Sequence, residues 1–288
     1  MAVSHQTGTA RSGDITLHYR RLGRPGSTPL VFVHGLSFFS WDWLEVAQAL
    51  ATDREAACLD MRGFGDSSRA ADYSVPAMAG DIGALMDHLG WPRAIVIGHS
   101  MGGRNSAWFA ARNPGRVAAL VLVDYTPENA PAGSQRVAQN VAGVPDAFAS
   151  VEEAMAYFKA DPKDPKKRAR FEAYLAPAAG GLAIKRDPYF REQFRKALAT
   201  GERAKLGVDM WQALGELRSP TLVVRGARSD LFAAEMVERV KAANPRIRLV
   251  EVDAGHNVAG DNPEGFVAAV RPFLASLEKE QSHANARS

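Results

Sequence analysis

Short runs of apolar residues alternate with segments of helical periodicity along most of the chain. Such runs are typical of buried strands, and they occur at 30–33, 56–60, 94–97, 117–123 and 221–224, with more mixed runs at 15–20 and 248–252. Segments with a helical pattern lie between or after them, at 41–50, 74–89, 105–110, 233–243 and 263–277. The alternation predicts a mostly parallel α/β sheet with right-handed crossovers and helices on both faces.

The pattern changes between residues 127 and 218. This segment has no strong apolar strand run and is rich in alanine, charge and proline. Its periodicity predicts short helices near 151–160, 166–175, 188–199 and 206–217. Because aromatic residues recur through it, we expect an inserted helical cap, residues 127–218, over a core of residues 1–126 and 219–288. The polar ends, 1–13 and 278–288, are expected to be mobile or frayed.

The sharpest local motif is Gly98-His99-Ser100-Met101-Gly102, which joins a predicted strand to a predicted helix. Its G-x-S-x-G spacing is that of a nucleophile elbow. A serine lifted out of such a turn has a strained backbone, so the residues two places away must be nearly free of side chain. The N–H groups at the start of the next helix favour a negative charge near Ser100.

Six polar residues closely follow predicted strands. In an open parallel sheet the carboxyl ends of the strands meet at one edge, where ligands and chemistry gather. The residues expected at this edge are His34, Asp60, Ser100, Asp124, Asp230 and His256. The chain therefore brings a serine, candidate acids and a histidine together, in the order Ser…Asp…His.

These motifs resemble the α/β-hydrolase superfamily over about residues 15–277. The resemblance rests on His34-Gly35, on Asp60-x-Arg62-Gly63-x-Gly65-x-Ser67, on the motif at 98–103 and on Gly255-His256. It implies the α/β-hydrolase fold, with a mostly parallel eight-stranded sheet and a helical cap. A shorter resemblance, at 98–106 and 123–127, is to the (E)-2-(acetamidomethylene)succinate hydrolase-like group, which contains an amide hydrolase of vitamin B6 breakdown.

The resemblance gives the candidate residues chemical roles. A serine hydroxyl needs an adjacent base to become a nucleophile. Ser100 would be that nucleophile and His256 the base, with a carboxylate holding the tautomer of the imidazole. By resemblance, the backbone N–H groups of Leu36 and Met101 would form the oxyanion hole, with His34 and Gly35 beside it.

Two aspartates compete for the third place in this triad. Asp230 follows the predicted strand 221–224 through a short loop, the position that the superfamily most often uses, and we expect it to be the acid. Asp124 ends the strand after the elbow helix, a position that some relatives use; it could instead cap the entry to the cap at Thr126 or pair with Arg104. Two carboxylates beside one imidazole would repel each other, so one should be engaged elsewhere or have a raised pKa.

Other polar residues near these motifs are expected to be structural. Asp60 and Arg62 should form a turn with an ion pair. Arg104 could reach an anionic substrate group, but we expect it to pair with a carboxylate. His34 and His99 are interpreted as neighbours of the site rather than bases. The other histidines show no metal-ligand spacing, so we expect no metal, and the triad needs no cofactor.

The composition of the chain limits the kinds of molecule that it is expected to bind. The chain has 288 residues, of which 46% are hydrophobic and 23% charged, which is ordinary for a globular protein. A net charge of +3 without a basic stripe argues against nucleic acid. The absence of a long apolar run or a signal-like start predicts a cytoplasmic protein that does not bind membranes, as a monomer or homodimer. The single cysteine, Cys58, is expected to be buried.

These observations favour a serine hydrolase acting on a small-molecule acyl substrate, which would be an ester, thioester, lactone or amide. Alternatives with the same triad are hydrolysis of a carbon–carbon bond in a diketone and perhydrolysis of the haloperoxidase kind. A third alternative is a slow-turnover small-molecule receptor. Dehalogenase and epoxide hydrolase are disfavoured, because those relatives have a carboxylate where Ser100 stands.

Overall fold

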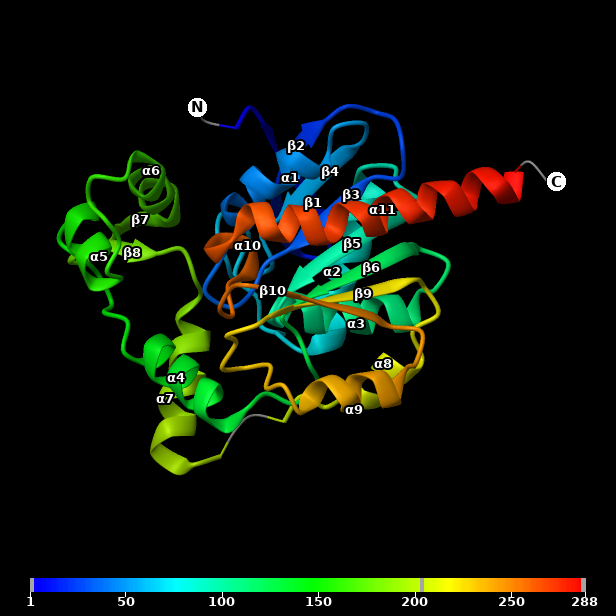
Figure 1. Cartoon of the computed structure of the whole chain (residues 1–288). Helices are drawn as coiled ribbons and strands as arrows, with labels where there is room; N and C mark the ends of the chain where they lie inside the picture. Colours follow the sequence, from blue (N-terminus) through cyan, green and yellow to red (C-terminus); the bar gives the residue numbers. More distant parts are fainter. Residues whose placement is uncertain (1–2, 203–204, 286–288) are drawn as a thin grey trace.

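A computed structural model of the chain describes residues 3–202 and 205–285, and it contains an eight-stranded sheet (Figure 1). The strand order is β1-β2-β4-β3-β5-β6-β9-β10, in which β2 is antiparallel to both of its neighbours, β1 and β4, and all other neighbouring pairs are parallel. The strands are β1 (Gln6–Ser12), β2 (Ile15–Gly23), β3 (Leu30–Val33), β4 (Glu55–Leu59), β5 (Ala94–His99), β6 (Val117–Val123), β9 (Thr221–Gly226) and β10 (Arg248–Val252). The predicted mostly parallel α/β sheet is confirmed.

The first strand was not predicted. The polar segment expected to be mobile instead pairs along its length with β2, from Gln6 opposite Arg21 to Ser12 opposite Ile15. The turn between the two strands places Gly13 at a φ of 61°, a conformation that glycine adopts without strain. Pairing and this turn hold the segment in place, and Ala10 joins the hydrophobic core. Residues 1–2 lie outside the description.

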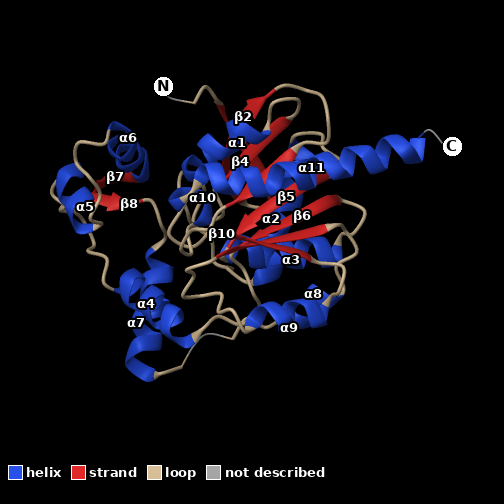
Figure 2. Cartoon of the chain, in the orientation of Figure 1, coloured by secondary structure: helices blue, strands red, loops and turns tan. Residues whose placement is uncertain are grey.

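Helices cover both faces of the sheet (Figure 2). Successive residues of β3 show how the faces are separated, since Val31 and Val33 join one hydrophobic cluster and Leu30 and Phe32 join the other. The first cluster includes residues of α2 (Val75–His88), α3 (Met101–Arg112), α8 (Met210–Gly215) and α9 (Met236–Ala243). The second includes residues of η1 (Ser40–Trp43), α1 (Leu44–Leu50), α10 (Val258–Asp261) and α11 (Pro263–Asn285).

The tail and the single cysteine can also be placed. The backbone of α11 is helical to Asn285, so the expected fraying from residue 278 is not seen up to that point, and residues 286–288 lie outside the description. Cys58 is fully buried in β4, as expected. Within the described ranges, no helix has the length and apolar character needed to cross a membrane.

The segment between β6 and β9 projects to one side of the sheet (Figure 1) and has a small hydrophobic cluster of its own. It contains α4 (Pro131–Ala142), α5 (Val151–Tyr157), α6 (Pro165–Tyr174), the antiparallel hairpin β7 (Leu175–Ala178) and β8 (Gly181–Ile184), and α7 (Pro188–Thr200). We call residues 131–200 the cap. Helix α4 and the hairpin were not predicted. Helix α8, expected in the cap, packs in the core cluster against α3 and α9.

Candidate active site

Ser100 lies in the turn between β5 and α3 with strained backbone dihedrals, φ 52° and ψ −115°. The flanking glycines are required by close backbone packing. A Cβ on Gly98 would lie 2.6 Å from the carbonyl oxygen of Gly102, and a Cβ on Gly102 would overlap the carbonyl oxygen of Val33. The local geometry is therefore that of a nucleophile elbow, with the serine lifted out of the turn.

A continuous hydrogen-bond chain runs from Ser100 through His256 to Asp124. Nε2 of His256 lies 3.0 Å from Oγ of Ser100, and Nδ1 lies 2.7 Å from Oδ2 of Asp124. Because a carboxylate accepts, Nδ1–H donates to Asp124 and leaves the lone pair of Nε2 facing the serine hydroxyl. This is the tautomer in which the imidazole can take the serine proton.

The structure holds Asp124 firmly in this position. Its side chain is fully buried, and the residue is 2% exposed with a φ of 45°. Besides His256, the carboxylate accepts hydrogen bonds from the backbone N–H of Gly226 at 2.8 Å and from the hydroxyl of Ser229 at 2.5 Å. Ser229 was missed in the sequence; its only signal was its place in the loop after a strand that ends at the same edge.

The prediction that Asp230 is the triad acid is wrong, because the carboxylate beside His256 is that of Asp124. The carboxylate of Asp230 is bound on both oxygens by the guanidinium of Arg136, at 2.5 and 2.7 Å, and this hydrogen-bonded pair lowers the pKa of Asp230. Strand order does not separate the two aspartates, because β9 lies between β6 and β10, the strand that His256 follows. The physical reason lies in the partners of each carboxylate: Gly226 and Ser229 fix that of Asp124 beside His256, whereas Arg136 of the cap binds that of Asp230.

The two other histidines near the site are scaffolding groups. Nε2 of His34 accepts from the backbone N–H of Met61 at 3.0 Å, so its Nδ1–H donates to the carbonyl of Gly35 at 2.7 Å. His99 donates from Nε2 to the carbonyl oxygen of His256 at 2.9 Å. Burial lowers the pKa of His34, and lowers that of His99 well below its usual range. Both are therefore neutral supports of the loops around Ser100.

A cavity of about 2340 Å³ lies over the hydrogen-bond chain and is lined by residues of both core and cap. Ser100, Asp124 and His256 line it, as do Leu36 and Met101, the two residues expected to form the oxyanion hole. His34 and Gly35 are not among the described lining residues. A Cβ on Gly35 would lie 2.8 Å from Nδ1 of His99, so Gly35 allows the loop to pack closely behind the site.

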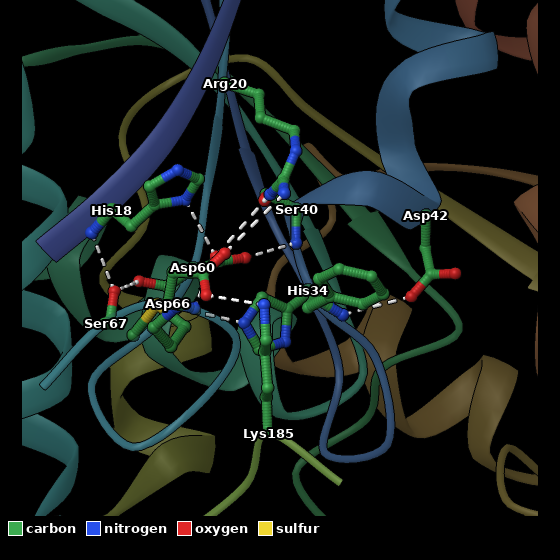
Figure 3. Close-up of polar contacts among 11 residues, drawn as sticks. His18, Arg20, His34, Ser40, Asp42, Asp60, Asp66, Ser67 and Lys185 are labelled. Atoms are coloured by element: carbon green, nitrogen blue, oxygen red, sulfur yellow. Dashed lines mark hydrogen bonds and ion pairs between the residues drawn. The ribbon is translucent and has the colours of Figure 1, made fainter. Parts of the chain in front are cut away.

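Asp60 is the centre of a separate buried cluster (Figure 3). His18, Arg20 and Ser40 surround its carboxylate, with Nδ1 of His18 at 2.9 Å and the backbone N–H of Ser40 at 2.6 Å. Burial alone would raise the pKa of Asp60, but the hydrogen bond from His18, the charge of Arg20 and the hydrogen bond from Ser40 lower it to about 2. Asp60 is thus a structural anion.

The ion pair expected between Asp60 and Arg62 is not formed. Arg62 instead binds Asp81 of α2 through two bonds of 2.7 Å. His18, Asp60 and Asp66 offer atoms within 4.8 Å of one another, as metal ligands would. However, Arg20 and Lys185 already pair with these carboxylates, Lys185 at 2.6 Å from Asp66 (Figure 3), so the acidic charge is compensated by the protein itself.

Arg104 also departs from expectation. It lines the cavity, but its side chain contacts Oδ1 of Asn105 and Sδ of Met78 rather than a carboxylate of the described residues. Asp124, the partner considered for it, is engaged by His256, Gly226 and Ser229. The site therefore contains a cation whose charge is not neutralised by a neighbouring acid.

Comparisons with known proteins agree with this fold. The family model described as alpha/beta hydrolase fold matches residues 28–263. The 3-hydroxybutyrate-oligomer hydrolase of Cupriavidus necator is 34% identical over 277 residues, covering 90% of this chain and 92% of that protein. The 2-(acetamidomethylene)succinate hydrolase of Mesorhizobium japonicum is 30% identical over 268 residues, covering 91% and 92%.

Comparison with solved structures also supports the α/β-hydrolase fold. The crystal structure of E-2-(acetamidomethylene)succinate hydrolase matches with a TM-score of 0.83 and 27% sequence identity, over 94% of this chain and 100% of that one. The region matched by the family model includes the elbow, the aspartate after β6 and the histidine after β10. On this evidence, the chain belongs to the α/β-hydrolase family and is similar to hydrolases along nearly its whole length.

Proposed function

We propose that this hydrolase cleaves a small-molecule carboxylic ester or amide through an acyl-enzyme on Ser100. The observation that carries the proposal is the hydrogen-bond chain from Ser100 through His256 to Asp124, with all three residues on the wall of one cavity. Two relatives, one named as a hydrolase of 3-hydroxybutyrate oligomers and one of 2-(acetamidomethylene)succinate, support an ester or an amide as the bond broken.

The first half of the reaction forms the acyl-enzyme. Nε2 of His256 takes the hydroxyl proton as Oγ of Ser100 bonds to the carbonyl carbon, and Asp124 stabilises the imidazolium. The backbone N–H groups of Leu36 and Met101 would bind the oxyanion, a contribution typically worth about 10²–10³-fold in rate for each donor. The tetrahedral intermediate then collapses, and the leaving alcohol or amine takes the proton from His256.

The second half releases the acid. A water molecule attacks the acyl carbon, His256 accepts its proton, and the bond to Oγ breaks as that proton returns to Ser100. His256 thus acts as a base in each attack and as an acid in each collapse. The groups that these steps use are the substrate, one water molecule and the side chains and backbone N–H groups named above.

The experiment is labelling with a neutral alkyl fluorophosphonate followed by peptide mass spectrometry. We expect a stoichiometric adduct on Ser100 and none in Ser100→Ala. A panel of acyl esters, amides and diketones then identifies the bond class. An unlabelled Ser100 in folded protein would exclude an activated serine and favour a receptor, whereas turnover of the diketone alone would favour carbon–carbon bond hydrolysis.

A further inference from the structure

Most arginines on the cavity wall have acidic partners. The pairs are Arg136 with Asp230, Arg170 with Asp42, and Arg228 with Asp253. Arg104 and Arg186 line the same cavity, yet neither has a carboxylate within 4.0 Å among the side chains described, those of residues 3–202 and 205–279. The cavity therefore carries positive charge that the protein leaves available.

Of these two arginines, Arg104 is the better placed to bind a substrate group that lies close to the reacting bond. It lies in the first turn of α3, and its backbone N–H donates to the carbonyl oxygen of Ser100 at 2.9 Å, so the two residues are one turn apart. Its guanidinium contacts only weak or neutral acceptors, Oδ1 of Asn105 at 3.1 Å and Sδ of Met78 at 4.0 Å. Burial lowers the pKa of Arg104, which reflects an uncompensated cation removed from water.

Tyr125 supplies a second, independent observation. It is 7% exposed and lines the cavity, and its hydroxyl has no hydrogen-bond partner in the described part of the chain. A buried tyrosine hydroxyl normally has a partner. Tyr125 packs against the start of α3, where a Cβ on Gly103 would lie 2.7 Å from the tyrosine Cβ. Burial raises the pKa of Tyr125, and the positive charge of Arg104 opposes this shift.

We propose that the substrate is anionic, and that its carboxylate binds the guanidinium of Arg104 and the hydroxyl of Tyr125 close to Ser100. A planar guanidinium matches the two oxygens of a carboxylate, and the tyrosine offers an additional O–H donor. Arg186 adds positive charge from the cap side of the cavity. The inference rests on the proposed function, because it identifies the substrate class of the Ser100 site.

The test uses pairs of alkyl fluorophosphonates that differ only at the end of the alkyl chain, which carries a carboxylate or the isosteric primary amide. Chains of three, four and five methylenes vary the reach. In each case Ser100 attacks phosphorus and fluoride leaves. The measured quantity is the ratio of the second-order labelling rates of the carboxylate and amide probes, which cancels any loss of reactivity common to both.

For at least one chain length, wild type should label faster with the carboxylate probe by roughly 10- to 100-fold. Arg104→Met should bring the ratio near one, Arg104→Lys should leave it intermediate, and Tyr125→Phe should lower it a few-fold. The matched control is Arg112→Met on the same helix, because Arg112 pairs with Glu216 and covers Trp108 away from the cavity lining. This control should keep the wild-type ratio.

The outcomes separate the two proposals. If the amide probe labels Ser100 and the wild-type ratio is near one at every length, the anionic subsite is excluded while the serine mechanism stands. A ratio that survives Arg104→Met also overturns the inference. If neither probe labels Ser100, the proposed function itself fails. If thermal melting shows that Arg104→Met is unfolded, the other two variants decide the question. A wild-type ratio of labelling rates in both Arg104→Lys and Tyr125→Phe would then overturn the assignment.

Discussion

The edge of the core sheet and the cap are built in opposite ways. Ser100 and Asp124 lie in strained turns that are fixed by the ends of buried strands and by several short hydrogen bonds. The cap's own hydrophobic cluster has six buried residues, and its helix α7 buries only Phe190. Its surface ion pairs, such as that between Lys166 and Glu45, are exposed.

The distribution of exposed apolar side chains sharpens this contrast. Within the described ranges, the large apolar residues that are exposed all lie between β6 and β9: Tyr157, Phe158, Tyr189, Leu198 and Leu206. All but Leu198 line the cavity. We infer that the rigid core edge performs the chemistry, whereas the loosely packed cap presents apolar surface for substrate contact and is the more tolerant of change.

The strongest test of the contrast removes the serine. Ser100→Ala should reduce kcat on the order of 10⁶-fold, as expected when a triad nucleophile is lost, with the melting temperature retained or raised because a strained serine is replaced. Steady-state kinetics and thermal melting measure the two quantities. Substantial residual turnover in well-folded protein would show that the core edge is not the chemical site.

A pair of glycine variants compares how tightly the two regions are packed. Gly102→Ala should destabilise the protein by about 3 kcal/mol, because the added methyl overlaps the backbone carbonyls of Val33 and His34. Gly201→Ala, at a φ of +72° after α7 with open space around it, should cost about 1 kcal/mol. Urea denaturation gives both values, and equal costs would contradict the contrast.

Acid stability provides the next test, through Asp60. Its pKa of about 2 in the folded protein lies below the usual 3.8, so Asp60 contributes stability above about pH 4 that is lost as the pH falls toward 2. The shift corresponds to about 2 kcal/mol. In urea titrations, the stability difference between wild type and Asp60→Asn should shrink by about this amount from pH 5 to pH 2. A constant difference would mean that the network does not hold the anion.

The smallest effect is expected at the surface of the cap. Lys166→Met breaks an exposed ion pair with Glu45 and should change the free energy of unfolding by less than about 0.5 kcal/mol. Urea denaturation at low and high salt is the measurement. A loss above 1 kcal/mol that disappears in high salt would show that charge pairing fastens the cap more strongly than its exposure indicates.

Much of the core could be predicted from sequence because its signals are local. Apolar runs identified seven of the strands, and the elbow motif together with the position after the last strand identified Ser100 and His256, which lie 3.0 Å apart. Strand β1 gave no comparable signal, since its polar residues are held by pairing with β2. The hairpin in the cap was also hidden, because β7 contains Pro177 and neither strand is an apolar run.

The identity of the triad acid and the surroundings of Arg104 could not be predicted from sequence, because both depend on residues that are distant in the chain. Asp124 and Asp230 both follow strands at the same edge, and only the positions of their side chains show which carboxylate meets the histidine. The partner of Asp230, Arg136, is 94 residues away in the chain. Likewise, the lack of a carboxylate beside Arg104 is visible only once the surrounding described residues are placed.

The most direct test of the central claim is to compare kcat for Asp124→Asn and Asp230→Asn on the same ester. Asparagine at the true acid leaves the histidine in the wrong tautomer and should cost on the order of 10⁴-fold. The account predicts this loss in Asp124→Asn, and a change of less than about threefold in Asp230→Asn, whose partner is Arg136. The reverse result, with Asp124→Asn nearly as active as wild type, would contradict the Ser100–His256–Asp124 mechanism.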